Sequence, residues 1–331
     1  MSEDFREIHD ELRAVSRDML AHAPVDWAQI TAAGWAGLEV PEAFGGAGAT
    51  FVETAIVLEE IGRAATASRF LGTTLAVGAL TALSPNESRN TLLGRLAAGE
   101  SAALASGFTL EHGTDGLVVS GRAEFVLDAD GADHLLLLAR DPDGAQVLVV
   151  PSAATVTPQP ALDETRSLAV ITTDRTPVSQ SWSPIVDPDA LGHRAAVSVA
   201  CDSLGLAEAM LARTVDYTSV RNQFGRAIGS FQAVKHACAD MLVHIAVARQ
   251  LVEAAVADVA AGLDAAVTTA MAKSYATSIA VDVAGKAMQL HGGIGYTWES
   301  GVHVYLKRAA LNRALFGSPS EHRRRLAARY G

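Results

Sequence analysis

The chain has 331 residues, of which 49% are apolar, and 26 basic against 37 acidic residues give it a formal net charge of −11. That length corresponds to about two domains of average size, and the apolar content excludes a disordered chain or a disulfide-dependent miniprotein. The acidic balance disfavours nucleic acid and anionic membranes as partners, because both select for basic surfaces.

The two cysteines, Cys201 and Cys238, provide neither a disulfide framework nor a zinc-ligand spacing, so we expect no metal site and a reducing, cytoplasmic environment. The first twenty residues mix acids and bases, unlike a signal or transit peptide. We see no run of about 18 apolar residues and therefore expect no membrane span.

The N-terminal region, residues 1–98, is predicted to be a helical domain. Residues 4–22 and 51–63 carry amphipathic patterns with the helical period, and the Pro/Gly-containing segment LEVPEAFGGAGAT connects them.

Residues 99–187 have a different pattern and are predicted to form a small β domain. Short β-prone runs are bounded there by Asp-Gly, Asp-Pro and Pro signals; they read LVVSG, AEFVL, HLLLLA, QVLVV and LAVITT.

Residues 188–331 are predicted to form a helical bundle, because no proline occurs between Pro188 and Pro319 and apolar residues recur with helical spacing. Breaks at Asn, Gly and Asp residues leave helices near 193–221, 230–261, 265–291 and 299–315, then a short basic helix from 320. Short turns between long helices favour antiparallel neighbours. The predicted fold class is therefore α+β, mainly α, with a four-helix bundle at its C-terminal end.

Three segments carry the most specific signal: VPEAFGGAG at 40–48, RNQFGRAIGSFQ at 221–232 and QLHGGIGYT at 289–297. Together and in this order they resemble the acyl-CoA dehydrogenase family, and the resemblance covers essentially the whole chain. It implies an FAD-dependent oxidoreductase that acts on the CH–CH group of acyl-CoA thioesters and passes electrons to an electron-transfer flavoprotein or a similar acceptor.

The resemblance also assigns residues to the ADP half of FAD, which in the family is bound mainly by a neighbouring subunit. Arg221 would end one helix and Gln232 would begin the next, so that both point at one extended polyphosphate ligand. A guanidinium fork suits a pyrophosphate and the ring of Phe224 suits an adenine. The matching loop runs from Gln289 to Gly292 and Gly293, where glycines let backbone N–H groups approach the cofactor.

Each of these residues also has a purely structural interpretation. Arg221 could be a helix-end cation on the surface and Phe224 a core residue. Gly292 with its neighbour Gly293 could be a plain helix C-cap. We interpret His291 as a packed loop residue and Glu42 as a turn residue.

The resemblance implies a glutamate base that removes the α-proton while the β-hydrogen leaves as hydride, and this base is missing from both family positions. Gly317 occupies the commoner position, and Ala195, twenty-six residues before Arg221, occupies the other. Glu321 is the nearest substitute, but it would require a loop shift past Pro319. We therefore predict no catalytic residue in this chain.

The part of the family site that binds the flavin ring also departs from the pattern. Residues 103–115 lack the Pro and the spacing of the family segment, and residues 120–128 keep a strand but lose the Trp. The flavin-ring half is thus predicted to be degraded, whereas the ADP half is intact.

This asymmetry resembles the short, base-less subunits of actinobacterial α2β2 acyl-CoA dehydrogenases that act on steroid side-chain thioesters. It implies a catalytic partner subunit whose FAD site this chain completes, with a role in lipid metabolism or steroid degradation. Two alternatives stay open: a flavin monooxygenase of the same fold, and a non-enzymatic acyl-CoA-binding scaffold.

Overall fold

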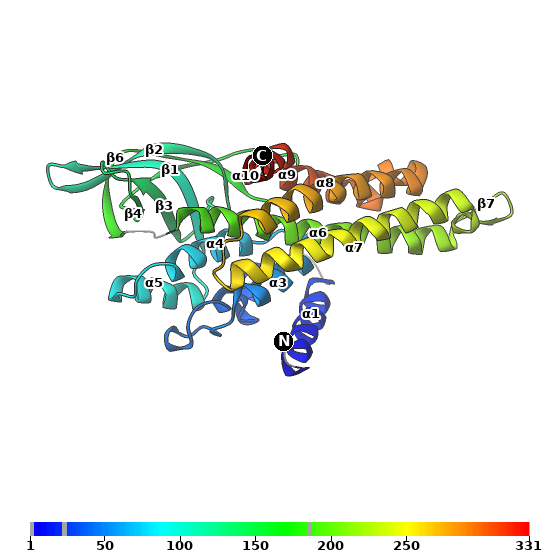
Figure 1. Ribbon diagram of the computed structural model, residues 1–331, viewed down its shortest axis with the longest axis horizontal. Helices are drawn as coiled ribbons and strands as arrows, with labels where there is room; N and C mark the ends of the chain where they lie inside the picture. Colours follow the sequence, from blue (N-terminus) through cyan, green and yellow to red (C-terminus); the bar gives the residue numbers. More distant parts are fainter. Residues whose placement is uncertain (1–2, 22–24, 184–186, 331) are drawn as a thin grey trace. The chain divides into compact units, whose positions relative to one another are not determined.

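The structure is a computed structural model that describes residues 3–21, 25–183 and 187–330. Its helices precede and follow one group of strands along the chain (Figure 1), which confirms the predicted mainly helical α+β class. Contacts divide the chain into two compact units, which are Met1–Pro24 with Ala55–Thr66 and Gly192–Gly331, and Val25–Thr54 with Ala67–Leu191. The three predicted domain boundaries stay predictions.

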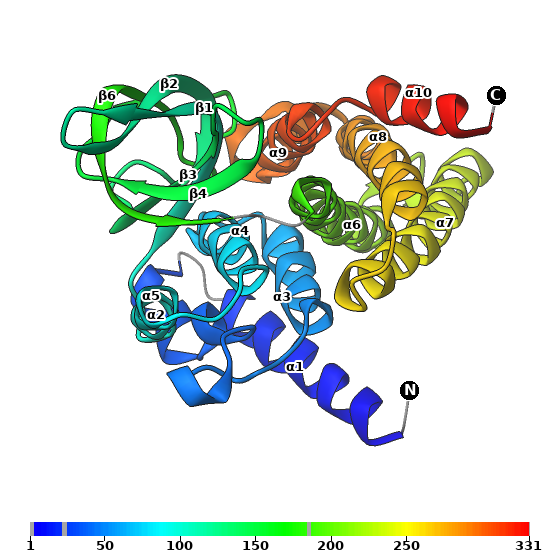
Figure 2. The same ribbon diagram turned by 60° about the vertical axis from the view of Figure 1, so that its left-hand side comes forward.

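The first unit is built of helices. They are α1 (Glu3–Ala21), most of α3 (Phe51–Ala64) and α6 (Pro188–Val220), then α7 (Gln232–Ala260), α8 (Ala266–His291), α9 (Val302–Ala314) and α10 (Pro319–Tyr330). Helix α8 packs against α7, α9 and α10, and α6 lies beside α7 in both views (Figures 1 and 2). The four predicted bundle helices and the short basic helix are all present.

Two predicted helix starts are wrong, and the first is that of α6, which begins at Pro188 rather than near 193. Helix α9 begins at Val302 rather than near 299, because Trp298–Ser300 form a 3-10 turn and Gly301 adopts a left-handed φ of +65°. A left-handed residue interrupts the α-helical hydrogen-bond ladder, so the regular helix starts after it.

Small residues let α3 and α6 approach until their backbones touch. A Cβ added at Gly205 of α6 would lie 1.8 Å from the carbonyl oxygen of Glu59, and one added at Gly62 of α3 would lie 2.0 Å from that of Asp202. Only glycine fits at such a distance, so these two residues set where the helices cross.

Ion pairs to buried carboxylates connect α9 to α6 and α7 to α3. Arg308 of α9 and Asp202 of α6 are each 1% exposed and lie 2.5 Å apart, and Arg249 of α7 contacts Glu59 Oε1 at 2.7 Å. Burial raises the pKa of Glu59, although the Arg249 guanidinium opposes the shift. Loss of one member of such a pair would leave an uncompensated buried charge, so the pairs fix how the helices associate.

The second unit combines short helices with the sheet. Its helices are α2 (Trp27–Ala32), α4 (Phe70–Thr81) and α5 (Glu87–Ala97), with 3-10 turns η1 (Trp35–Gly37) and η2 (Glu42–Phe44). Helix α4 is buried over Phe70–Leu80 and packs on strand β1. Glu42 begins η2, which agrees with its interpretation as a turn residue.

The sheet has the order β2-β1-β3-β4-β6-β5. An additional pairing joins β2, the first strand of this order, to β6, the next to last, so the strands curl around a core (Figure 2). All pairings are antiparallel except β1 with β3. The strands are β1 (Ala102–Gly113), β2 (Gly116–Leu127), β3 (His134–Arg140), β4 (Gln146–Pro151), β5 (Thr155–Pro158) and β6 (Leu168–Trp182).

Residues Asp189–Val220 of α6 are long and apolar enough to cross a membrane by length and composition, which corrects the expectation that no segment is. Their mean hydropathy reaches 1.4 over the most apolar window, yet 83% of that window is buried within the protein. The core helix of a soluble protein passes the same test.

Candidate functional site

A strained hairpin connects α6 to α7. Residues Asn222–Gln223 (β7) pair with Arg226–Ala227 (β8), and the turn between them holds Phe224 at φ +52° and Gly225 at φ +80°. A left-handed conformation costs a residue with a side chain about 1–2 kcal/mol. The Phe224 side chain is nevertheless 91% exposed. Strain combined with an exposed aromatic ring is typical of a binding position, and it contradicts the alternative that Phe224 is a core residue.

Two residues that the sequence did not single out hold this hairpin in place. The Phe231 ring meets the Phe224 ring edge-to-face at a centroid distance of 6.2 Å, and the Arg226 guanidinium lies 4.0 Å from the centre of the Phe231 ring. Such contacts contribute about 0.5–1.5 kcal/mol each. Phe231 lies within the segment RNQFGRAIGSFQ, directly before Gln232, and this position is the sequence feature that could have identified it.

Gln232 is the first residue of α7, and α6 ends just before Arg221, as predicted. The preceding Phe231 gives α7 no side-chain cap, so backbone N–H groups of the first turn have no side-chain partner there. The start of this long helix carries partial positive charge from the aligned peptide dipoles, which favours an anion nearby.

The end of α8 is held against the end of α6. The His291 ring stacks on Tyr217 at a centroid distance of 4.5 Å, and its Nδ1 donates to the Ala287 carbonyl oxygen at 2.7 Å. His291 is 8% exposed, which confirms that it is a packed residue. Tyr217 lies one turn before Arg221 and His291 directly precedes Gly292, so this contact brings the two predicted half-site segments together.

Gln289 is exposed in the last turn of α8, and Gly292 caps the helix by donating its N–H to the Gln289 carbonyl. The structural interpretation of Gly292 as a C-cap therefore holds. A Cβ added at Gly292 or Gly293 would meet no atom within 4 Å, so the backbone there is open to a ligand. Both interpretations are compatible, because the cap uses the Gly292 N–H and leaves the space beside both glycines open.

These residues fit the ADP half of FAD. Arg221 is exposed, and none of the described residues forms an ion pair with it. Its free guanidinium, the helix start and the open backbone suit a pyrophosphate, and the Phe224 ring suits an adenine. The residue roles themselves stay predictions.

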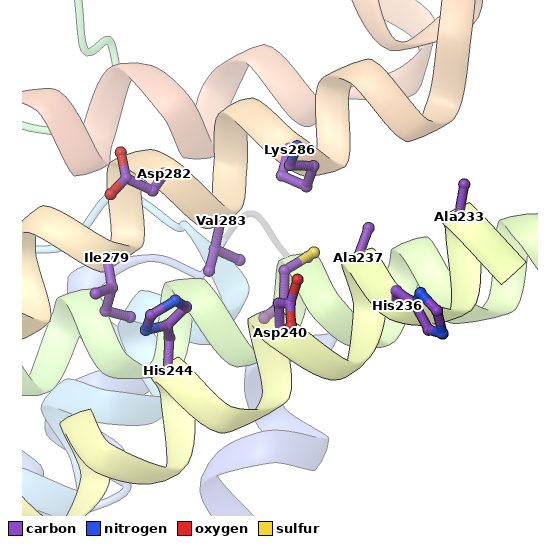
Figure 3. A pocket seen from close by; sticks show the side chains of 10 residues that line it. Ala233, His236, Ala237, Asp240, His244, Ile279, Asp282, Val283 and Lys286 are labelled. Carbon is purple, nitrogen blue, oxygen red and sulfur yellow. The ribbon is translucent and has the colours of Figure 1, made fainter.

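A groove lies between α7 and α8 (Figure 3). It has a volume of about 470 Å³ and is lined by Ala233, His236, Ala237, Asp240, Met241, His244, Ile279, Asp282, Val283 and Lys286. Lys286 reaches Gln289 Oε1 at 3.5 Å. Within the described ranges, no group of three or more His, Cys, Asp or Glu side chains could hold a metal ion.

The two family positions of the base lie in very different surroundings. Ala195 is buried within α6 at 6% exposure. Gly317 lies between α9 and α10 at φ +94°, after Phe316 at φ +55°. Neither position carries an acid.

Glu321 is engaged in a helix cap. Its Oε2 accepts the Ser318 N–H at 2.5 Å, and the Glu321 N–H donates to Ser318 Oγ at 3.3 Å, which is a capping box at the start of α10. The hydrogen bond from Ser318 holds the pKa of Glu321 below its usual range. A carboxylate held in this way is a poor proton acceptor, so the structure gives no support to Glu321 as a replacement base.

The segments predicted for the flavin-ring half lie in neighbouring strands. Residues 103–115 include most of β1, a strand that the sequence analysis did not identify, and 120–128 lie largely in β2, as expected. Phe125 in β2 has φ +56° and is 53% exposed, and its N–H donates to Gln159 Oε1 at 2.9 Å. The degraded state of this half stays a prediction.

Comparison with known proteins identifies relatives over nearly the whole chain. Residues 2–100 match the profile "Acyl-CoA dehydrogenase, N-terminal domain" and residues 191–331 the profile "Acyl-CoA dehydrogenase, C-terminal domain". Acyl-CoA dehydrogenase IpdE2 of Mycolicibacterium smegmatis is 35% identical over 96% of this chain and 92% of its own length. IpdE2 of Mycobacterium tuberculosis is 37% identical over 88% and 82%. The solved structure of the Tcur3481-Tcur3483 steroid ACAD G363A variant matches with a TM-score of 0.86 at 26% identity, over 97% of both chains.

Proposed function

Because the chain belongs to the acyl-CoA dehydrogenase family, whose cofactor is FAD, we propose that it is a subunit without a catalytic base of its own. It completes the FAD site of a catalytic partner chain in the α,β-dehydrogenation of acyl-CoA thioesters. The proposed assembly is an α2β2 heterotetramer in the cytoplasm.

The observation that carries this proposal is the contrast between two regions of one helical unit. At the α6–α7 hairpin, an aromatic ring is 91% exposed on a strained backbone beside an unpaired guanidinium. At the α9–α10 loop, by contrast, the base position is a glycine, and the carboxylate of Glu321 accepts a hydrogen bond from the Ser318 N–H in the cap of α10. Exposed binding groups without a reacting group suit a chain that serves a neighbour's cofactor.

When bound, FAD would supply the acceptor for the hydride that leaves the β-carbon of the thioester. The residues of this chain would bind and orient the distant end of that cofactor. Arg221 neutralises the pyrophosphate, Phe224 covers the adenine, and the amides of Gln232 and Gln289 supply paired donors and acceptors. The α-proton is left to a base of the partner chain.

The substrate class is proposed to be a steroid or fatty acyl-CoA. The solved relative that is 26% identical is named a steroid ACAD, and its name joins two proteins, which favours both a polycyclic acyl group and a second chain. An electron-transfer flavoprotein or a similar acceptor would reoxidise the cofactor.

Activity assays on the chain alone and with its partner test the proposal. The chain alone, with added FAD, acyl-CoA and an artificial electron acceptor, is expected to show no dehydrogenation, because general-base catalysis contributes about 10²–10⁴-fold. Co-expression with a family member encoded beside it is expected to give turnover. Turnover by the purified chain alone would contradict the proposal.

A further inference from the structure

A buried lysine of α8 holds the loop between α9 and α10, residues 315–318, by hydrogen bonds to backbone carbonyl oxygens. Lys273 of α8 is fully buried, and its Nζ donates to the carbonyl oxygens of Gly317 at 2.8 Å and Arg313 at 3.3 Å. The Arg313 carbonyl belongs to the last turn of α9, where no further helical N–H follows. The ammonium group thus joins the end of the helix to the loop.

A buried histidine holds the same loop from the α10 side. His322 is 2% exposed, and its Nε2 donates to the Phe316 carbonyl oxygen at 3.0 Å. Glu321 accepts the next amide, that of Ser318. Three consecutive loop residues therefore have a backbone group fixed by a side chain.

This arrangement determines where a side chain at position 317 would go. A Cβ added to Gly317 would lie 3.0 Å from His322 Nε2, 3.4 Å from His322 Cδ2 and 3.8 Å from Glu321 Oε2. The backbone there has φ +94°, a conformation that residues with a side chain rarely adopt. A side chain at 317 would start toward the first turn of α10 and meet the imidazole.

We infer that the base position of this chain is closed and not merely vacant. Lys273 and His322 are positioning residues that hold Phe316 and Gly317 in a backbone that admits glycine, and the imidazole occupies the space that a side chain at 317 would enter. Returning a carboxylate to 317 by a single substitution therefore does not restore a base. This inference rests on the proposed function only in identifying 317 as the base position.

A double-mutant cycle on the full chain tests the closure, with the free energy of unfolding measured by denaturant titration. Gly262→Ala is the matched control, because Gly262 has φ +64° and open space around its Cβ position. The control is expected to change the unfolding equilibrium constant by roughly 5- to 30-fold, the cost of left-handed backbone alone. Gly317→Ala is expected to cost roughly tenfold more, and His322→Ala is expected to remove most of that excess.

The closure is refuted if Gly317→Ala costs no more than Gly262→Ala, or if its excess persists without the imidazole. His322→Ala leaves a buried carbonyl unpaired, so a second measurement covers the case in which that variant does not fold. Lys273→Met is expected to speed amide hydrogen exchange over residues 315–320 at least tenfold. Lys286→Met, an exposed lysine of the same helix, is the control and is expected to leave that exchange unchanged.

Unchanged exchange in Lys273→Met would overturn the claim that this lysine holds the loop. Both measurements use the chain without flavin or partner. A chain that passes them but binds a full complement of FAD alone would contradict the proposed function and leave the closed position standing. A chain that fails these measurements but binds no FAD alone would contradict the closed base position and leave the proposed function standing.

Discussion

Replacing Arg221 by alanine is expected to weaken flavin binding with little effect on folding. The side chain is exposed and forms no ion pair among the described residues, so its loss should change the free energy of unfolding by less than about 0.5 kcal/mol. Its backbone bonds, from its N–H to the Tyr217 carbonyl at 3.0 Å and from the Ile228 N–H to its own carbonyl at 2.8 Å, remain available in the variant. Hydrogen bonds to a charged pyrophosphate contribute about 1.5–3 kcal/mol, which corresponds to roughly a tenfold to hundredfold loss of FAD affinity.

The assay is a fluorescence titration of FAD into the apo complex of this chain with its partner. Arg323→Ala is the matched control, since Arg323 is an exposed arginine of α10 in the same unit. The control is expected to keep the affinity of the unaltered complex. Equal affinities for the Arg221→Ala complex and the control complex would refute the assignment of Arg221 to the cofactor.

Three further substitutions test separate parts of the account. Phe224→Gly relieves about 1–2 kcal/mol of left-handed strain and loses about 0.5–1.5 kcal/mol of ring packing, so the melting temperature should change little. The FAD affinity of the complex should fall about tenfold. Unchanged affinity would argue against stacking of the Phe224 ring on the adenine. Glu321→Gln in the complex should leave turnover within about twofold, whereas lost turnover with flavin and assembly retained would identify Glu321 as the base. Burial lowers the pKa of Lys273 from 10.5 to about 8, so between these pH values the unfolded chain binds more protons than the folded chain and the folded state becomes more stable as the pH rises. Relative to Lys273→Met, the free energy of unfolding of the unaltered chain, measured by urea titration, should increase by about 3 kcal/mol from pH 8 to 10.5. An increase toward lower pH would contradict the burial of this lysine.

The extents of α7 and α8 could be predicted closely from the sequence, whereas α4 could not be identified. Helix α7 was expected at 230–261 and spans Gln232–Ala260, because one face of it is apolar and Gly229 marks the break before it. Helix α4 is buried on nearly all sides and therefore shows no period. Strand β1 consists largely of small residues with no β-branched run at its start, so it lacked a strand signal.

The residues of the candidate half-site could be selected from the sequence because they stand in short motifs at helix ends. The groups that hold them could not be. The stacking of Tyr217 on His291 joins residues far apart in the chain, and neither belongs to a local pattern that predicts the other. Lys273 and His322 likewise donate hydrogen bonds to backbone carbonyl oxygens. Every residue has such an acceptor, so the sequence does not indicate which one a side chain will use.

The flavin content of the chain alone and in the complex tests the central claim most directly. The account holds that this chain supplies the ADP half of a site whose flavin-ring half belongs to its partner. The absorbance at about 450 nm, where bound flavin absorbs, should therefore show a nearly colourless chain when it is purified alone. The co-purified complex should hold about one FAD per two chains, the ratio expected if only the partner's ring-binding half is intact. Yellow protein with one FAD per chain, obtained from this chain by itself, would contradict the account.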